Sequence, residues 1–288
     1  MRYLITGSEG QLGYDIIREL KKRGINDNNI IAPTLEEMDI TDIDQVENVV
    51  LASSPDIIFH CAAWTNVDLA EEKEDLVYKV NVEGTKNLVE MAREVGAKII
   101  YISTDYVFDG KKEGIYDVKD MPNPLGVYGK TKFLGEVHTM EYSKSFIVRV
   151  SWVFGINGNN FVKKMLELAQ TKDELNIVSD QIGSPTYTVD LAKLLVDMSE
   201  TEKYGIYHAT NSGYCSWAEF AKYIFETNNL NVKVNEIKTS DYKTKAERPL
   251  NSKLDKQILL DKGFYLLPEW KDAIIRYNEE LKTNINTK

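Results

Sequence analysis

The sequence has few cysteines and few histidines, and these shortages argue against disulfide-based and metal-based folds. Its 288 residues include two cysteines, and Cys61 ends the apolar run DIIFHC, where a buried, inert thiol is expected. The three histidines, His60, His138 and His208, are scattered without the spacing of metal ligands. A chain of this length buries a large enough core to fold without a disulfide or a metal ion.

The chain also lacks a surplus of positive charge and any long apolar run. Its formal net charge is −10, so no basic field is present to attract nucleic acid or anionic membranes. No apolar stretch approaches the length that spans a bilayer, and the N-terminus has the pattern of a strand followed by glycine rather than that of a signal peptide. We therefore expect a cytoplasmic protein with neither nucleic-acid nor membrane partners.

The first half of the sequence contains a regular alternation of strand and helix patterns. Short apolar runs predict strands at 2–6, 29–32, 56–60, 98–103 and 146–150. Amphipathic helical patterns lie between them, for example in 75–95. Because the apolar runs do not alternate in polarity, they suit strands that are buried on both faces of a parallel sheet. This half predicts an α/β fold with a Rossmann-like, doubly wound parallel sheet.

The second half predicts a smaller lobe that is interleaved with the last pieces of the sheet. Helical patterns lie at 160–169, 189–198, 216–226 and 268–281, with short strand patterns at 205–209 and 233–237. We assign residues 1–152, with a returning segment around 186–210, to a dinucleotide-binding domain. Residues 153–185 and 211–288 form a smaller α+β substrate-binding lobe. No low-complexity linker divides the two parts, so a ligand cleft is expected between them.

A glycine-rich turn follows the first predicted strand. Gly7, Gly10 and Gly13 stand three residues apart in LITGSEGQLGYDII, between a strand and a helix. Such glycines permit a tight turn, let the main chain approach a pyrophosphate and let the helix pack closely on the strand. The alternative is a plain strand-to-helix turn, but the strand before and the helix after favour dinucleotide binding.

The choice between NADH and NADPH stays open. An acid usually ends the second strand of an NAD-binding fold, and a nearby arginine selects the 2′-phosphate of NADP. Here that strand ends IIAPTLEE, where Ala32, Pro33 and Thr34 provide neither group. Glu36 or Glu37 could reach the ribose, although loop acids are more often solvated surface.

Three further residues fall where reduction of a ketone needs them. Thr104 follows the predicted strand 98–103, and Tyr128 and Lys132 lie about one turn apart on a predicted helix. When hydride reaches a carbonyl carbon, its oxygen needs a proton; Tyr128 is the candidate donor, and Thr104 can hydrogen-bond the same oxygen. We expect the Lys132 ammonium to lower the pKa of Tyr128 from about 10 toward neutral pH. Each residue alone has an ordinary structural alternative, but the three together favour chemistry.

Longer strings around these residues carry a family resemblance. In order, CAAWTNVDLAE, STDYVFDG, VYGKTKFLGE, RVSWVFG, DQIGSPT and RPLNSKL resemble the extended short-chain dehydrogenases/reductases and, within them, the dTDP-4-dehydrorhamnose reductases. The resemblance covers the chain from residue 2 to about 281. It implies NAD(P)H-dependent reduction of the C4 keto group of dTDP-4-dehydro-L-rhamnose to dTDP-L-rhamnose, a precursor of cell-surface polysaccharide, with a nucleotide sugar as the small-molecule partner.

The resemblance also implies roles for individual residues. The catalytic set is matched by Tyr128, Lys132 and Thr104. The positions that match cofactor contacts are Gly7, Gly10, Gln11, Leu12, Gly13, Asp39, Ile40, Cys61, Ala62, Ala63, Trp64, Thr65, Asn81, Ser103, Tyr128 and Lys132. The positions on the nucleotide-sugar side are Thr104, Asp105, Tyr106, Trp152, Gln181 and Arg248.

Two of these positions keep an ordinary alternative. Trp152 offers a broad face for a sugar or a base, but it is equally well explained as a core tryptophan where the two lobes meet. Arg248 suits a substrate diphosphate because a guanidinium fork fits phosphate oxygens, and its alternative is a surface ion pair.

Some members of this family bind magnesium at a dimer interface through three acidic residues. Asp15 and Asp190 match two of those positions in a shorter form, and the C-terminal LKTNINTK supplies no third acid. We therefore expect both to be helix-surface acids and predict no metal site. A homodimer stays an open alternative.

Two other classes of function are compatible with the same fold: another nucleotide-sugar enzyme and a non-catalytic binding protein. A related 4,6-dehydratase is expected to carry an Asp-Glu pair after the threonine, whereas Thr104 is followed by Asp105 and Tyr106, and an epimerase would retain its dinucleotide permanently. A non-catalytic relative, similar to the regulatory β subunit of methionine adenosyltransferase, would use the fold to bind a partner protein.

Overall fold

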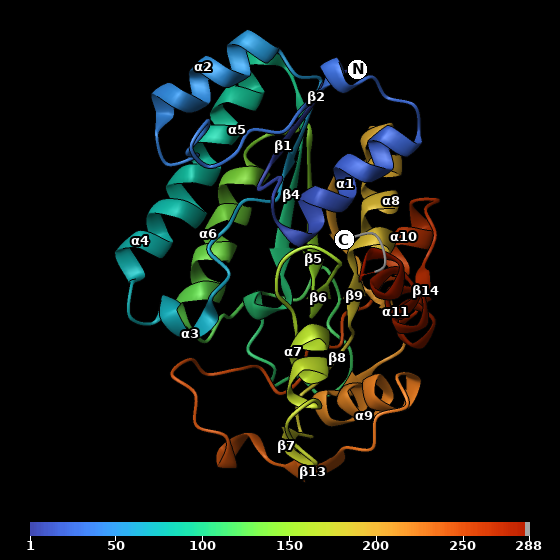
Figure 1. Ribbon diagram of the computed structural model, residues 1–288. Helices are drawn as coiled ribbons and strands as arrows, with labels where there is room; N and C mark the ends of the chain where they lie inside the picture. Colours follow the sequence, from blue (N-terminus) through green and yellow to red (C-terminus); the bar gives the residue numbers. More distant parts are fainter. Residues whose placement is uncertain (286–288) are drawn as a thin grey trace.

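A six-stranded sheet forms the centre of the computed structural model, which describes residues 1–285 (Figure 1). Every pairing in it is parallel, and the strand order is β10-β5-β4-β3-β1-β2. The strands are β1 (Tyr3–Thr6), β2 (Ile30–Ile31), β3 (Ile57–His60), β4 (Lys98–Thr104), β5 (Ser145–Val150) and β10 (Gly205–His208). The first five coincide with the apolar runs, and the Rossmann-like doubly wound fold is confirmed.

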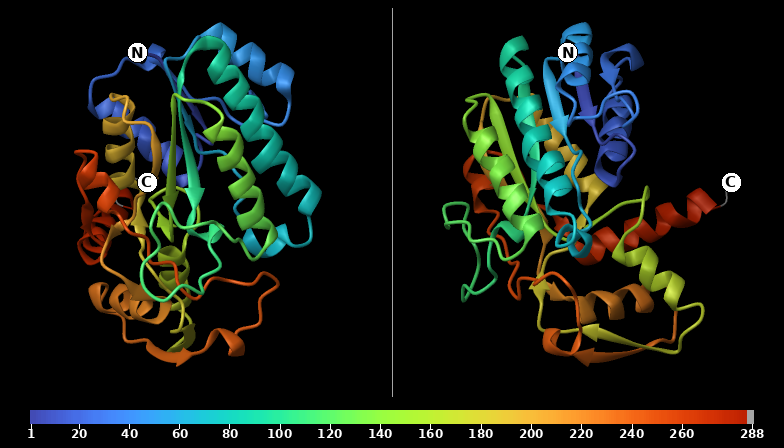
Figure 2. Two further views of the ribbon diagram at one scale, coloured as in Figure 1. Left: turned by 180° about the vertical axis from the view of Figure 1, so that it is seen from behind. Right: turned by 90° about the vertical axis from the view of Figure 1, so that its left-hand side faces the viewer.

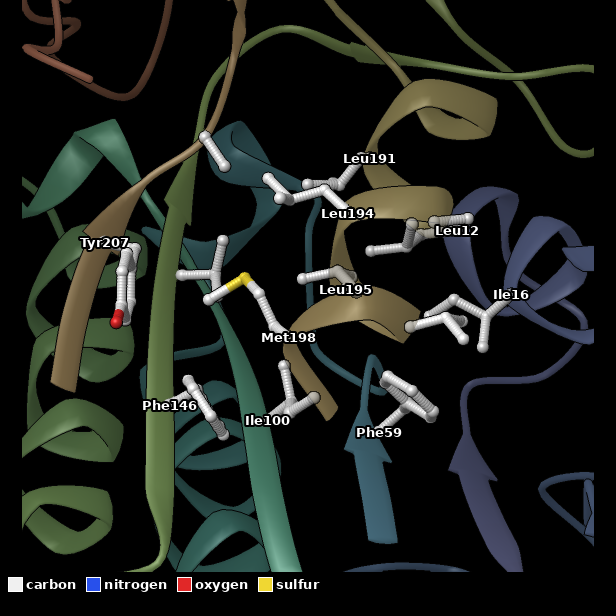
Figure 3. Packing of buried hydrophobic residues seen from close by; sticks show 14 of the residues in the cluster. Leu12, Ile16, Phe59, Ile100, Phe146, Leu191, Leu194, Leu195, Met198 and Tyr207 are labelled. Atoms are coloured by element: carbon white, nitrogen blue, oxygen red, sulfur yellow. The ribbon is translucent and has the colours of Figure 1, made fainter. Parts of the chain in front are cut away.

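Helices cover both faces of this sheet (Figure 1). One face carries α1 (Gln11–Lys22) and α8 (Thr188–Ser199), and the other carries α2 (Ile43–Ser53), α5 (Gly84–Val95) and α6 (Val127–Met140). Figure 3 shows apolar side chains filling the space between the sheet and the first pair of helices. This cluster includes Leu12, Ile16, Phe59, Ile100, Phe146, Leu191, Leu194, Leu195, Met198 and Tyr207, all buried.

The predicted helix in 75–95 contains a wider turn. The structure divides it into α4 (Glu74–Tyr78), a π-helical segment η2 (Lys79–Glu83) and α5. A π-helical turn inserts an extra residue and is frequent at functional sites. Here it turns the Asn81 side chain toward the loop that follows β3, as the contacts given below demonstrate.

A smaller lobe lies beyond the carboxyl ends of the sheet strands in both views of Figure 2. Its own core joins aromatic and aliphatic side chains of two helices and two paired strands, including Val162, Leu175, Phe220 and Phe225. Those elements are α7 (Phe161–Leu168), α9 (Trp217–Thr227), β7 (Glu174–Val178) and β13 (Lys233–Ile237). The C-terminal helix α11 (Trp270–Ile285) packs on it.

The remaining elements are short. Three two-stranded pairs connect the lobes: β6 (Val153–Phe154) with β9 (Thr186–Tyr187), β8 (Ile182–Gly183) with β12 (Cys215–Ser216), and β11 (Asn211–Ser212) with β14 (Leu267–Glu269). The short helices are α3 (Val67–Ala70), α10 (Gln257–Asp261), η1 (Asp27–Asn29), η3 (Asp105–Val107) and η4 (Thr239–Asp241).

The chain returns to the sheet through α8 and β10 after α7 and β7 have joined the core of the smaller lobe. The residue boundaries that we assign to the two lobes stay a prediction, and positions 286–288 of the expected lobe lie outside the described residues. Within residues 1–285, no helix combines the length and the apolar character that a membrane crossing requires.

Candidate active site

A cavity of about 1110 Å³ opens along the carboxyl ends of the sheet strands, at the junction with the smaller lobe. Ligands of open α/β sheets bind at this edge. Its wall brings together most of the residues predicted from the sequence. They are Gly7, Gly10, Gln11, Leu12, Gly13, Asp39, Ile40, Cys61, Ala62, Ala63, Trp64, Thr65, Ser103, Thr104, Asp105, Tyr106, Tyr128, Lys132 and Trp152.

The glycine-rich turn makes one end of the cavity. Gly7 has a φ of +63°, and a Cβ there would lie 2.7 Å from the backbone nitrogen of Ala62. A Cβ on Gly13 would lie 2.3 Å from the carbonyl oxygen of Gly7. Within the described residues, no side chain caps the first turn of α1, so its N–H groups are available to an anion. This cradle fits a dinucleotide pyrophosphate.

Beside the end of β2, the cavity is lined by the uncharged residues Pro33, Thr34 and Leu35. Ser8 Oγ donates to the Pro33 carbonyl at 3.0 Å, and Thr34 lines the cavity behind it. The carboxylate of Glu37, a candidate for the ribose, accepts the backbone N–H of Thr34 at 2.8 Å and is used within its own loop. Among the described residues, the cations of the cavity wall are Lys79 and Lys132.

Asn81 supports the cavity wall from behind. Its Oδ1 accepts the backbone N–H of Trp64 at 2.8 Å, and its Nδ2 donates to Thr131 Oγ1 at 3.1 Å. The side chain is 1% exposed and is not part of the lining. Asn81 therefore holds the loop after β3 against α6, where the sequence predicted a direct cofactor contact.

Thr104 and Tyr128 meet in the middle of the cavity. Thr104, the last residue of β4, donates to Asp105 Oδ1 at 3.0 Å and accepts the Tyr106 backbone N–H at 3.2 Å. Tyr128, in the first turn of α6, lies beside Thr104, and its ring meets that of Tyr106 edge to face, with centroids 5.5 Å apart. The two hydroxyl groups can therefore converge on one ligand oxygen.

The expected lowering of the Tyr128 pKa is wrong for this site. Burial raises the pKa of Tyr128 to about 12, the nearby Thr104 hydroxyl opposes the rise, and the Asp105 charge adds to it. Tyr128 is thus a phenol, able to donate a proton, throughout the neutral range. Burial also raises the pKa of Asp105, to about 6.

The side chain of Lys132, with its ammonium group, is buried next to the aromatic ring of Tyr101. Its Nζ lies 4.1 Å from the centroid of the Tyr101 ring and donates no hydrogen bond to a protein group within residues 1–285. Burial lowers the pKa of Lys132 to about 7, while Glu136 and Cys61 raise it. The ammonium N–H groups are thus available to a ligand. Burial raises the pKa of the Cys61 thiol to about 12, which fits the predicted inert thiol.

Two stacked tryptophans form the wall on the side of the smaller lobe. Trp152 and Trp217 lie 3.7 Å apart between centroids, and both line the cavity. Trp152 has a φ of +49°, and Gly183 leaves room for its ring, since a Cβ there would lie 2.8 Å from it. Trp152 therefore packs against the core of the smaller lobe and also lines the cavity, and its contact with a sugar or a base stays a prediction. Trp217 was missed, because nothing in SWAEF distinguishes it from an ordinary helix residue.

Gln181 and Arg248 lie outside the cavity wall. Gln181 accepts from Trp217 Nε1 at 3.2 Å and donates to Thr239 Oγ1 at 3.1 Å, so it supports the tryptophan pair. Arg248 holds both carboxylate oxygens of Asp68, at 3.2 and 2.7 Å. This pair joins the segment after η4 to α3, next to Tyr106.

The expectation that Asp15 is a surface acid is wrong. Asp15 is 2% exposed because it lies on the side of α1 that packs against α8, where it accepts from Thr188 Oγ1 at 2.5 Å and from Arg18 at 2.8 Å. The two oxygens of Asp190 each accept an N–H of Arg276 at 2.7 Å. Both carboxylates are thus already paired with guanidinium groups, and the described residues contain no cluster of three or more potential metal ligands. The absence of a metal site stays a prediction.

The chain matches the family described as "RmlD substrate binding domain" over residues 1–283. It is 43% identical to a dTDP-4-dehydrorhamnose reductase of Aggregatibacter actinomycetemcomitans, covering 95% of this chain and 97% of that protein. It is 41% identical to the spore coat polysaccharide biosynthesis protein SpsK of Bacillus subtilis, covering 97% of each.

Solved structures agree with this match. A dTDP-4-dehydrorhamnose reductase of Bacillus anthracis, crystallised with NADP, is 43% identical and has a TM-score of 0.94 over 97% of this chain and 99% of that one. A UDP-glucose 4-epimerase of Thermus thermophilus, crystallised with NAD, has a TM-score of 0.80 over 98% of this chain and 99% of that one, at 18% identity, which demonstrates a shared fold alone.

Proposed function

The chain belongs to the RmlD substrate-binding-domain family, and from this premise we propose that it is an NAD(P)H-dependent reductase of dTDP-4-dehydro-L-rhamnose. The product would be dTDP-L-rhamnose. One observation carries the proposal beyond family membership: the hydroxyl groups of Thr104 and Tyr128 and the buried side chain of Lys132 line one cavity at the carboxyl ends of the strands. The names of relatives at 43% identity support the sugar and the nucleotide.

The residues of the cavity fit a nicotinamide dinucleotide. The amides of the first turn of α1 and the Gly7–Gly13 loop would hold the pyrophosphate, and the Lys132 N–H groups would hold ribose hydroxyls. The wall near Thr34 selects neither ribose form, so both NADH and NADPH are proposed as cofactors; a relative at 43% identity was crystallised with NADP. When bound, the reduced nicotinamide supplies a hydride to the carbonyl carbon.

The chemistry of this chain lies at the carbonyl oxygen. Tyr128 donates its proton to that oxygen as negative charge develops on it, and Thr104 orients the oxygen by a hydrogen bond. The pKa of Tyr128, raised to about 12 by burial, keeps the donor protonated before the reaction. The positive charge of Lys132 stabilises the phenolate that remains. Trp152 and Trp217 give the sugar nucleotide a flat apolar wall.

The test follows the loss of reduced-nicotinamide absorbance with dTDP-4-dehydro-L-rhamnose. Tyr128→Phe is expected to lower kcat by about 10²- to 10⁴-fold because the proton donor is lost. Fluorescence titration should find NADPH binding within a few fold of wild type. Tyr78→Phe, at an exposed tyrosine of α4, is the matched control and should not change kcat. Absence of turnover by the wild-type protein would contradict the proposed reaction, and a fast Tyr128→Phe variant would contradict the proposed donor.

A further inference from the structure

A buried ion pair lies directly behind the active site. Glu136 on α6 and Arg149 on β5 have side chains that are 0% and 2% exposed. Arg149 Nε donates to Glu136 Oε1 at 2.8 Å, and Arg149 Nη2 donates to Glu136 Oε2 at 2.7 Å. Buried pairs of this kind often add little stability compared with apolar residues of the same volume. Their presence beside reacting groups therefore suggests a role in positioning or electrostatics.

Glu136 links the two elements that carry the catalytic groups. Tyr128, Lys132 and Glu136 are spaced by four residues and form one stripe along α6. Ser103 Oγ donates to Glu136 Oε1 at 2.5 Å, and Ser103 immediately precedes Thr104 at the end of β4. One carboxylate therefore fixes the rotation of α6 relative to the strand end where Thr104 lies.

Arg149 also lies close to groups on other parts of the sheet, and these further neighbours carry no charge. Its Nη1 is 3.5 Å from His208 Nε2 on β10 and 3.5 Å from the Val118 carbonyl. His208 Nδ1 lies 3.0 Å from the Asp255 carbonyl, and burial together with Arg149 lowers the pKa of His208 to about 3. His208 is therefore neutral at physiological pH, and the charges behind the site are those of Glu136 and Arg149.

The groups that face Lys132 are otherwise uncharged near neutral pH. From β4, Tyr101 presents its ring face, and burial raises its pKa well above 10.0. From β3 and the loop after it come His60, whose pKa burial lowers to about 3, and Cys61, whose pKa burial raises to about 12. On α6 itself, Tyr128 is a phenol. Of the two described groups that raise the pKa of Lys132, Cys61 is a buried thiol and Glu136 is the carboxylate.

We propose that Glu136 is a positioning residue of the reductase site, whose carboxylate sets α6 against β4 through Ser103 and supplies the negative charge that the Lys132 ammonium faces. This inference rests on the proposed reductase function, because it assigns the charge of Lys132 a role in holding the cofactor and stabilising phenolate. Cofactor binding nevertheless tests it separately from turnover.

The test is the pH dependence of Glu136→Gln, which preserves shape and removes the charge. As pH rises through the pKa of Lys132, the ammonium is lost and NADPH affinity and kcat both fall. Without the Glu136 charge, the pKa of Lys132 is lower, so both declines should begin about one pH unit lower than in wild type. This shift is equivalent to up to about a tenfold loss of affinity at a fixed alkaline pH. Fluorescence titration of NADPH and initial rates measure the two profiles.

Two further variants keep the result interpretable. The double variant E136Q/R149M leaves no unpaired guanidinium, so it remains useful where Glu136→Gln alone fails to fold. Asp190→Asn is the matched control, because it breaks another carboxylate–arginine pair, with Arg276, away from the cavity. It should lower the melting temperature and leave both pH profiles in place.

The outcomes separate this inference from the reductase proposal. A shift of the NADPH-binding profile in Glu136→Gln or in the double variant supports the role of Glu136, even if the wild-type protein does not reduce dTDP-4-dehydro-L-rhamnose. Unshifted binding and rate profiles in both variants overturn the role of Glu136. A uniform loss of affinity at every pH, without a shift, also overturns it, since a purely structural defect would have that effect.

Discussion

At the scale of single residues, burial of the Lys132 ammonium lowers the stability of the folded protein. Burial lowers its pKa from 10.5 to about 7, so between these values the unfolded chain holds a proton that the folded protein has released. The unfolded state therefore binds more protons in this window, and the free energy of unfolding attributable to Lys132 rises as pH increases from about 7 to 10.5. Below pH 7 the full penalty of a buried ammonium remains.

Lys132→Met should consequently make the protein more stable and less active. The methionine keeps the length of the side chain without the charge, so we expect a gain of about 1–3 kcal/mol in the free energy of unfolding at pH 6, measured by urea denaturation. NADPH affinity and kcat should both fall. Lys130→Met, at an exposed position of the same helix, is the control and should change stability by less than about 0.5 kcal/mol. A destabilised Lys132→Met would contradict this account of the charge.

Variants of Arg248 and Asp68 can distinguish two roles for Arg248: binding the substrate diphosphate, or forming a purely structural ion pair. If Arg248 exchanges the Asp68 carboxylate for the diphosphate of a sugar nucleotide, Arg248→Gln should raise KM for that substrate by about tenfold or more. Asp68→Asn removes the competing anion, so its KM should stay the same or fall. Steady-state kinetics of both variants decide between the roles, because a mere ion pair predicts similar defects for the two.

Residue roles were predictable where the signal is local. Tyr128 and Lys132 share a helix face because four residues make about one turn, and Thr104 ends a strand that is apparent from its apolar run. Gln181 and Arg248 were less predictable, because what they do depends on Thr239 and Asp68, 58 and 180 residues away. Glu136 was visible in the string VYGKTKFLGE, but its partner Arg149 belongs to a strand that reads as plain core.

At the scale of elements, the close packing of the turn between β1 and α1 requires glycine, because a side chain would collide with the backbone. In Gly13→Ala the new Cβ would lie 2.3 Å from the Gly7 carbonyl oxygen, so the loop or the helix must move. We expect a loss of about 1–3 kcal/mol in stability and of at least about tenfold in NADPH affinity, measured by thermal unfolding and fluorescence titration.

Gly24→Ala provides the comparison within the same region. Gly24 follows α1, has a φ of +78° and has open space where a Cβ would stand. Its substitution should cost about 1–2 kcal/mol through backbone strain alone and leave NADPH affinity as in wild type. Equal loss of affinity in the two variants would contradict a specific role for close packing at Gly13.

The existence of the main elements was predictable, and their irregularities were not. The apolar runs located β1 to β5 because buried parallel strands need continuous apolar sequence. The π-helical turn at Lys79–Glu83 was invisible, since a single wider turn hardly changes the apolar period of 75–95. Pairs such as β6 and β9 have two residues each, too few to carry any pattern.

At the scale of the whole molecule, α1, α8 and α11 are joined by internal ion pairs. Arg18 is 2.5 Å from Glu280 as well as 2.8 Å from Asp15, and Arg276 binds Asp190. These contacts give the protein its own cations at positions where relatives in its family are expected to use a metal. The helix α11 is thereby fixed to α1 within one chain.

Magnesium should therefore have no effect on the stability of this protein. With the Asp15 and Asp190 carboxylates already paired, we expect the melting temperature in excess Mg²⁺ and in EDTA to agree within about 1 °C. Differential scanning fluorimetry measures both, and Ca²⁺ at the same ionic strength controls for general salt effects. A rise of several degrees that is specific to Mg²⁺ would show that the cation displaces an arginine.

The tryptophans give the cavity an optical property. The chain has four tryptophans, and three of them, Trp64, Trp152 and Trp217, line the cavity. Indole emission overlaps the absorption band of reduced nicotinamide, so a bound reduced cofactor would accept energy from these rings. Oxidised cofactor and sugar nucleotide lack that absorption. The intrinsic fluorescence of the unlabelled protein thus distinguishes the redox state of its ligand during a single turnover.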